Sequence, residues 1–191
     1  MRLLPLFFFF LNLQLMAQEL PFSTIPKPPQ DYTAVNSINR VIQGLGFRFY
    51  WATEGLRKID LSYRPSKDAK NTLETLQHIY TLSSTVLNAV NNKASLRPPP
   101  ETLKNLKELR RATLNNLKQA ADLFQKYSDP QLNNLNIIFE REGKQYKFPI
   151  WNLLNGPIAD ALYHTGQIVS FRRTSGNPIA KGVNVFLGIK N

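Results

Sequence analysis

The sequence predicts an all-α fold, a four-helix bundle with a small β-hairpin between the third and the fourth helix. Four long segments carry apolar residues at spacings of three and four, which is the repeat of an amphipathic helix. Two short strand-like runs flank Gly143 between the third and fourth segments, which is typical of a hairpin. With 191 residues, of which 42% are hydrophobic, the chain is long enough to form one domain with a sizeable core.

Residues 1–17 have the pattern of a secretory signal peptide. Arg2 precedes an apolar run that is short for a membrane span, and Ala17 supplies a small residue at the expected cleavage point. We therefore expect export to the periplasm or the medium, with no stable membrane span after cleavage. An uncleaved N-terminal anchor is the alternative.

The rest of the chain divides into three parts. Residues 18–32 contain four prolines and are expected to form an extended leader. Residues 33–178 are expected to form the bundle. Residues 179–191 form a C-terminal tail that is expected to pack on it, with alternating apolar residues that favour a short strand.

The first helix is expected over about residues 33–57. Its apolar face consists of Ile38, Ile42, Leu45, Phe49, Ala52 and Leu56. Phe47, Trp51 and Glu54 lie on a second stripe, well away from that face. Aromatic residues there indicate a second contact surface or the wall of a pocket, or they occur there by chance. Trp51 is therefore a candidate for substrate binding. Glu54 is a candidate general base.

The second helix is expected over about residues 71–91. Asn71 with Glu74 three residues later resembles a capping box, and His78 falls at the margin of the apolar side. The runs Asn91-Asn92-Lys93 and Pro98-Pro99-Pro100 are expected to form a linker.

The third helix is expected over about residues 101–127, with its basic residues on the side opposite its leucines. We interpret that basic side as a solvated face, although an anion-binding surface is the alternative. The formal net charge of the chain is +11, but aromatic residues do not alternate with these charges as single-strand binding would require. A nucleic acid is therefore not an expected partner.

The chain has no cysteine, which excludes disulfides and thiolate ligands.

The fourth helix carries the residues that indicate chemistry. Pro157 suits the first turn of a helix, and a Ser-Gly-Asn-Pro stretch ends it. Asp160 and His164 are four residues apart, so they stack one turn above the other. His78 is the other histidine of the chain. Facing helices of a bundle can bring these three side chains to one metal ion.

Two imidazoles and one carboxylate leave coordination positions open, which is the pattern of a reactive metal site more than a structural one. Gln167 lies one turn beyond His164 and could support that ligand through a hydrogen bond. On spacing alone the signal is weak, because a histidine at a helix margin is usually a hydrogen-bonded core residue.

These residues carry a resemblance to the DinB-like superfamily of bacterial metal-binding four-helix bundles. The quoted runs are Glu74-Thr-Leu-Gln-His78, Trp151 through His164, and His164-Thr-Gly-Gln167, and the match spans about residues 33–187. The resemblance implies one histidine ligand from the second helix and a His-x3-His pair from the last. His78 and His164 match the first and third positions, whereas Asp160 stands where relatives carry histidine. This departure affects the identity and affinity of the metal.

The resemblance implies a divalent metal ion, with zinc as the first expectation and nickel, iron or manganese as alternatives. Some members are thiol-dependent transferases or hydrolases. Export argues against thiol transfer, so activation of water for hydrolysis or group transfer is the favoured chemistry. Trp51, Trp151 and Arg172 are the candidates for the substrate pocket. The substrate is expected to be a small molecule, and a homodimer is left open.

Two other functions remain open from the sequence. The chain could be a non-catalytic binding or structural bundle with vestigial metal ligands. It could also bind anionic surfaces through its positive charge, which is the weakest interpretation because charge alone causes non-specific attraction.

Overall fold

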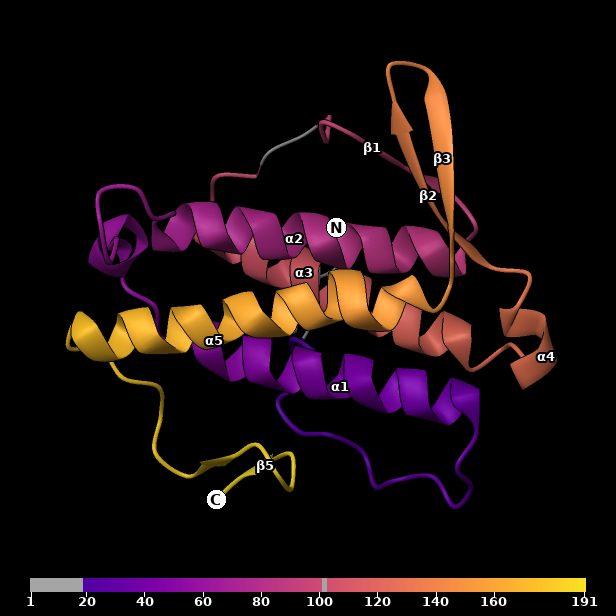
Figure 1. Ribbon diagram of the computed structural model, residues 1–191. Helices are drawn as coiled ribbons and strands as arrows, with labels where there is room; N and C mark the ends of the chain where they lie inside the picture. The colour runs from indigo at the N-terminus through magenta and orange to yellow at the C-terminus, as the bar shows by residue number, and fades with distance from the viewer. Residues whose placement is uncertain (1–18, 101–102) are drawn as a thin grey trace, which may run out of the picture.

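The computed structural model describes residues 19–100 and 103–191 (Figure 1). The expected signal peptide at residues 1–17 therefore lies outside the described residues. Among the described residues, no helix combines the length and the apolarity that crossing a membrane requires.

Within the described chain, four long helices lie alongside one another and form a bundle (Figure 1). They are α1 (Ala34–Thr53), α2 (Thr72–Val90), α3 (Leu106–Phe124) and α5 (Ala159–Thr174). The predicted all-α bundle is confirmed. Both α1 and α2 pack against α3 and α5, so α1 and α2 lie diagonally across the bundle. The fold thus makes α2 and α5 neighbours, although 68 residues separate the end of one from the start of the other.

Side chains cap the helices where the sequence changes from extended to helical backbone. The predicted capping box is present on α2, since Asn71 accepts from the Glu74 backbone N–H and the Glu74 carboxylate accepts from that of Asn71. The start of α3 is later than predicted. The Asn105 side chain accepts hydrogen bonds from the backbone N–H groups of Lys107 and Glu108, which fixes Asn105 as the N-cap.

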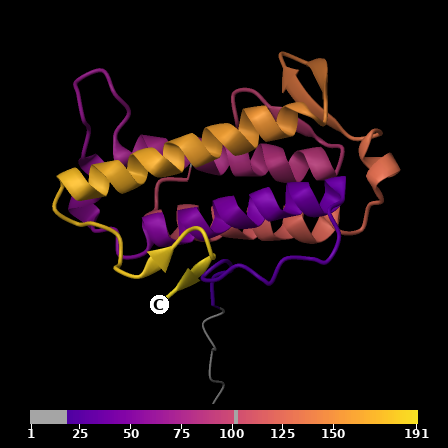
Figure 2. The same cartoon turned by 60° about the horizontal axis from the view of Figure 1, so that its bottom comes forward.

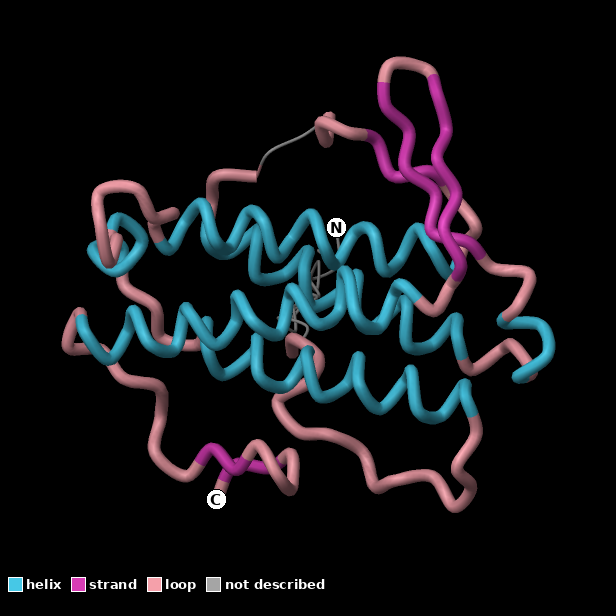
Figure 3. Tube along the Cα trace, viewed as in Figure 1, coloured by secondary structure: helices cyan, strands magenta, loops and turns pink. Residues whose placement is uncertain are grey.

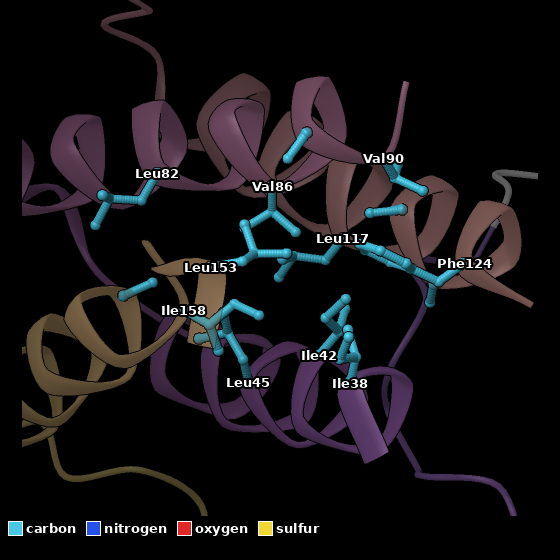
Figure 4. Close-up of a cluster of buried hydrophobic side chains, with 14 of the residues drawn as sticks. Ile38, Ile42, Leu45, Leu82, Val86, Val90, Leu117, Phe124, Leu153 and Ile158 are labelled. Atoms are coloured by element: carbon cyan, nitrogen blue, oxygen red, sulfur yellow. The ribbon is translucent and has the colours of Figure 1, made fainter. Parts of the chain in front are cut away.

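Apolar side chains from all four long helices fill the centre of the bundle (Figure 4). Each fully buried large side chain contributes roughly 1.5–3 kcal/mol to folding. The close-up labels Ile38, Ile42, Leu45, Leu82, Val86, Val90, Leu117, Phe124, Leu153 and Ile158.

The second stripe of α1 is a contact surface for the two ends of the described chain. Trp51 donates its indole N–H to the carbonyl of Ser23 at 3.1 Å, and the ring of Phe22 packs on Gly46. The leader is joined in turn to the tail, because the backbone N–H of Ile25 donates to the carbonyl of Gly188 at 2.8 Å. In Figure 2 the leader and the tail lie together beneath α1.

The C-terminal tail forms a two-stranded hairpin of its own. Strand β4 (Val183–Asn184) pairs antiparallel with β5 (Ile189–Lys190), and the Lys190 ammonium lies 5.6 Å from the centroid of the Trp51 ring. The strand expected from the alternating apolar residues is therefore present in shorter form.

The predicted hairpin between the third and fourth long helices is also present (Figure 3). Strand β2 (Asn136–Arg141) pairs antiparallel with β3 (Lys144–Pro149) through a turn at Glu142-Gly143, where both residues have positive φ. A single turn of helix, α4 (Asp129–Leu132), precedes it.

The connection between α2 and α3 contains a short strand that the sequence did not predict. Residues Ala94–Leu96 form strand β1, which pairs in parallel with β2 and extends the hairpin to a three-stranded sheet. A strand of three residues has no periodicity to detect, and its partner lies more than 40 residues further along the chain. The sheet stands beside α2 at one end of the bundle (Figure 1).

Candidate metal centre

An irregular helical turn positions the start of α5. Residues Leu154–Ile158 form a π-helical segment in which Gly156 departs from helical geometry, with φ −95° and ψ −106°. Pro157 follows and is buried, and the regular helix begins at Ala159. Asp160 therefore lies in the first turn of α5, where the helix dipole favours a negative side chain. Turns of this type are frequent at functional sites.

His78 from α2 meets Asp160 and His164 from α5. The Nε2 atom of His78 lies 3.1 Å from Oδ2 of Asp160, and the Nε2 atom of His164 lies 3.2 Å from Oδ1 of the same carboxylate. The two imidazole rings are nearly perpendicular, with centroids 4.6 Å apart. One ligand atom from each residue lies within 4.8 Å of the other two, so the three side chains can reach a single ion.

A hydrogen bond fixes the orientation of one of the two rings. The Nδ1 atom of His164 lies 2.7 Å from Oε1 of Gln167, one turn further along α5. With Nδ1–H donating to that oxygen, the neutral ring presents an unprotonated Nε2. This lone pair faces Oδ1 of Asp160, so two acceptors lie 3.2 Å apart. Such a contact becomes attractive when a cation lies beside both atoms or when the ring takes up a second proton.

The cluster is open to solvent on one side. The exposed fraction of the side chain is 15% for His164, 34% for His78 and 42% for Asp160. Burial lowers the pKa of His78, an effect partly opposed by the hydrogen bond that the ring donates to Asp160. Burial thus favours the neutral form of His78, which is the form that binds metals.

A hollow of about 640 Å³ opens beside Asp160. It lies between α2, the three-stranded sheet, the π-helical segment and the first turns of α5. Its walls comprise Leu82, Arg97, Ile137, Phe139, Phe148, Asn152, Asn155, Gly156, Pro157, Ala159, Asp160 and Tyr163. Arg97 and the sheet residues were not predicted, because no local sequence pattern indicates on which helix the sheet packs.

The structure places the other candidates for substrate binding away from this hollow. Arg172 is buried and donates to the carbonyls of Ala52 and Glu54 at the end of α1, at 3.0 and 2.7 Å. The carboxylate of Glu54 forms an ion pair with Arg110. Neither residue lines the hollow beside Asp160.

The two tryptophans also lie elsewhere. Trp51 is covered by the leader and the tail. Trp151 is exposed and lines a separate, mostly apolar hollow of about 350 Å³ formed with α1 and α4. Of the candidate residues, the structure thus brings together His78, Asp160, His164 and Gln167.

The fold is similar to that of known DinB-like proteins. The crystal structure of a DinB-like protein from Bacillus subtilis superposes with a TM-score of 0.54 at 16% sequence identity, covering 73% of this chain and 92% of that protein. A DinB family member from Shewanella denitrificans superposes with a TM-score of 0.46 at 18% identity, covering 81% and 89%. No protein-family model and no curated protein matches the sequence. The superposition on the Bacillus subtilis protein shows that the chain has a DinB-like fold.

Proposed function

We propose that this chain is an exported member of the DinB-like superfamily that binds a divalent metal ion through His78, Asp160 and His164. The observation that supports this is the convergence of these three side chains within 4.8 Å on a partly exposed site. Two imidazoles and a carboxylate suit zinc best, and they also suit nickel, iron and manganese.

We further propose that the site serves hydrolysis or group transfer on a small molecule. A bound divalent cation would supply Lewis acidity, which lowers the pKa of water and polarises a substrate oxygen. The chain supplies a ligand set with one negative charge, a hydrogen bond from His164 to Gln167 that holds one ring, and an adjoining hollow for a substrate. Glu54 has no support as the general base, because its carboxylate is paired with Arg110.

The second candidate is a non-catalytic bundle in which the same residues hold a metal for stability or only hydrogen-bond to each other. The contact that favours it is the one between His78 and Asp160, which pairs the ring with Oδ2 of the carboxylate without an ion. The two candidates differ in whether a loaded site turns over any substrate.

Metal analysis of the protein purified without a histidine tag tests the site. We expect about one equivalent of a divalent metal per chain, and loss of that metal in His164→Ala and Asp160→Asn. Asp122→Asn is the matched control, because Asp122 is exposed on α3 and pairs only with Lys118. Metal-free protein that fails to take up added zinc, nickel, iron or manganese contradicts the proposal.

Turnover separates the two candidates. The zinc-loaded protein is assayed on a panel of activated esters, amides and thiol-acceptor substrates, with Asp160→Asn in parallel. Hydrolysis or transfer that is lost in Asp160→Asn supports the enzyme. A metal that raises the melting temperature without turnover on any of these substrates supports the non-catalytic bundle.

Export rests on the pattern of residues 1–17 alone. Expression of the full chain in a bacterium, followed by fractionation and mass spectrometry of the N-terminus, tests it. We expect an exported product that begins near Gln18. A cytoplasmic product that retains residues 1–17 contradicts export.

A further inference from the structure

The hollow beside Asp160 has two charged residues in its walls, Arg97 and Asp160 itself. The remaining lining is apolar or aromatic, apart from the amides of Asn152 and Asn155 and the phenol of Tyr163. A volume of about 640 Å³ is within the range of small-molecule sites, and such sites combine apolar walls with a few polar groups. Arg97 is therefore the one positively charged group that the described residues contribute to the lining of this hollow.

Several contacts hold Arg97 in place. Its backbone N–H donates to the carbonyl of Glu140 at 2.8 Å, as a continuation of the pairing between β1 and β2. Its Nη2 donates to the hydroxyl of Thr85 at 2.9 Å, and its guanidinium lies 4.8 Å from the centroid of the Phe139 ring. The side chain is thus oriented before any ligand arrives, which reduces the entropy lost on binding.

The charge of Arg97 has no acidic partner among the described residues, where no carboxylate lies within 4.0 Å of its guanidinium. Burial lowers the pKa of Arg97, although arginine stays protonated at neutral pH. A half-buried cation without a counter-ion is unfavourable, so an incoming anion gains more there than at the open surface. The planar guanidinium matches a carboxylate, which can accept two parallel hydrogen bonds.

We propose that the hollow binds small molecules that carry one carboxylate and an apolar or aromatic body, with the carboxylate on Arg97 and the body against Phe139 and Phe148. The negative charge of Asp160 in the same hollow disfavours a dianion such as a phosphate monoester. The proposed carboxylate site is supported by the contacts of Arg97 alone. Its use as a substrate site rests on the proposed metal-dependent function.

Calorimetric titration with 4-phenylbutyrate and its neutral analogue 4-phenylbutyramide tests the proposal. The titrations use metal-free protein, so that the carboxylate cannot bind a metal. We expect the acid to bind at least tenfold more tightly than the amide, Arg97→Gln to remove the preference, and Arg97→Lys to retain part of it. Arg141→Gln is the matched control, because Arg141 is an exposed residue at the end of β2 outside the hollow.

A second variant keeps the test decisive if Arg97→Gln does not fold. Asn155→Asp adds a carboxylate at an exposed position of the hollow, and we expect it to weaken binding of 4-phenylbutyrate and to leave binding of the amide unchanged. Equal affinity of the wild type for acid and amide, or an unchanged preference in a folded Arg97→Gln, overturns the proposal. Tighter binding of phenyl phosphate than of 4-phenylbutyrate overturns the preference for a monoanion.

Failure of this proposal can be told apart from failure of the metal site. If the protein binds one equivalent of metal but shows no Arg97-dependent preference for the acid, the metal centre is supported and the carboxylate site is contradicted. If the protein shows the preference but takes up no metal, the carboxylate site is supported and the proposed metal-dependent function is contradicted.

Discussion

Gln167 lies one turn beyond His164 on α5, and its Oε1 atom is 2.7 Å from the Nδ1 atom of that histidine. Partners of this kind hold the ring and keep its other nitrogen unprotonated for a metal. We expect Gln167→Leu to weaken metal affinity by about 10–100-fold, as loss of such a partner typically does. Competition with a zinc chelator measures it.

The matched control for Gln167 is Gln119→Leu, because Gln119 is exposed on α3 and no side-chain hydrogen bond of the described residues involves it. The control should bind metal as the wild type does. An unchanged affinity in Gln167→Leu would show that His164 is oriented by packing alone.

Arg172 joins the end of α5 to the end of α1 through the carbonyls of Ala52 and Glu54. Its loss leaves buried carbonyl oxygens without donors, so we expect Arg172→Met to lower the free energy of unfolding by about 3 kcal/mol. Urea denaturation measures this change. The neighbouring exposed residue provides the control, Arg173→Met, which should change stability by less than about 0.5 kcal/mol. Metal affinity that falls in Arg172→Met, while the folded state persists, would argue for a role at the metal centre.

Asp60 gives the protein a defined sensitivity to acid. Its carboxylate is buried and accepts hydrogen bonds chiefly from Arg57, with Asn177 and Ser175 as further donors, and these hold its pKa well below the usual value. A depressed pKa in the folded state contributes stability that is fully present above the unfolded value, about 3.9, and is lost as the pH falls toward the folded value.

We therefore expect Asp60→Asn to be less stable than the wild type at pH 7 by roughly 2 kcal/mol. The difference should shrink between about pH 4 and pH 2, where the wild type loses this contribution. Urea denaturation at pH 7, 4 and 3 measures it, with the exposed Asp122→Asn as control. A difference that stays constant down to pH 2 would contradict the assignment.

Two helical glycines should respond in opposite ways to alanine. A Cβ at Gly46 would lie 2.5 Å from the ring of Phe22, so Gly46→Ala must displace the leader and should destabilise the fold by about 1–3 kcal/mol. A Cβ at Gly166 meets nothing within 4 Å, so Gly166→Ala should stabilise α5 by about 0.5–1 kcal/mol. Thermal melting of both variants measures these changes. A stabilised Gly46→Ala would show that the leader does not pack there in solution.

The sequence predicted what depends on local spacing. The helical repeat and the capping pair Asn71 and Glu74 predict the first and last residues of α2 to within a few positions. The helices that α2 neighbours in the bundle could not be predicted, because they depend on the path of the long connections between helices. Spacing and bundle geometry therefore gave only a weak indication that His78 meets Asp160, and the resemblance to a family strengthened it.

Arg172 illustrates a different limit of the sequence. It follows Ala161, Thr165 and Ile168 on the buried stripe of α5, although it was a candidate for the substrate pocket. Its partners are backbone carbonyls of α1, and no sequence pattern reveals such acceptors. The same reason hid Arg97, whose surroundings depend on the packing of a three-residue strand.

The three proposed ligands lie on two long helices. Most of the hollow beside them is built by the connections between helices, namely Arg97 just after β1, and β2, β3 and the π-helical segment before α5. Helices that form a core tolerate little change, but connections accept insertions and substitutions readily. A longer or shorter hairpin would alter which molecules fit without moving either imidazole. The architecture thus keeps metal ligation and ligand choice in separate parts of the chain, so exchange of the hairpin between related bundles would transfer binding preference and leave metal affinity as it was.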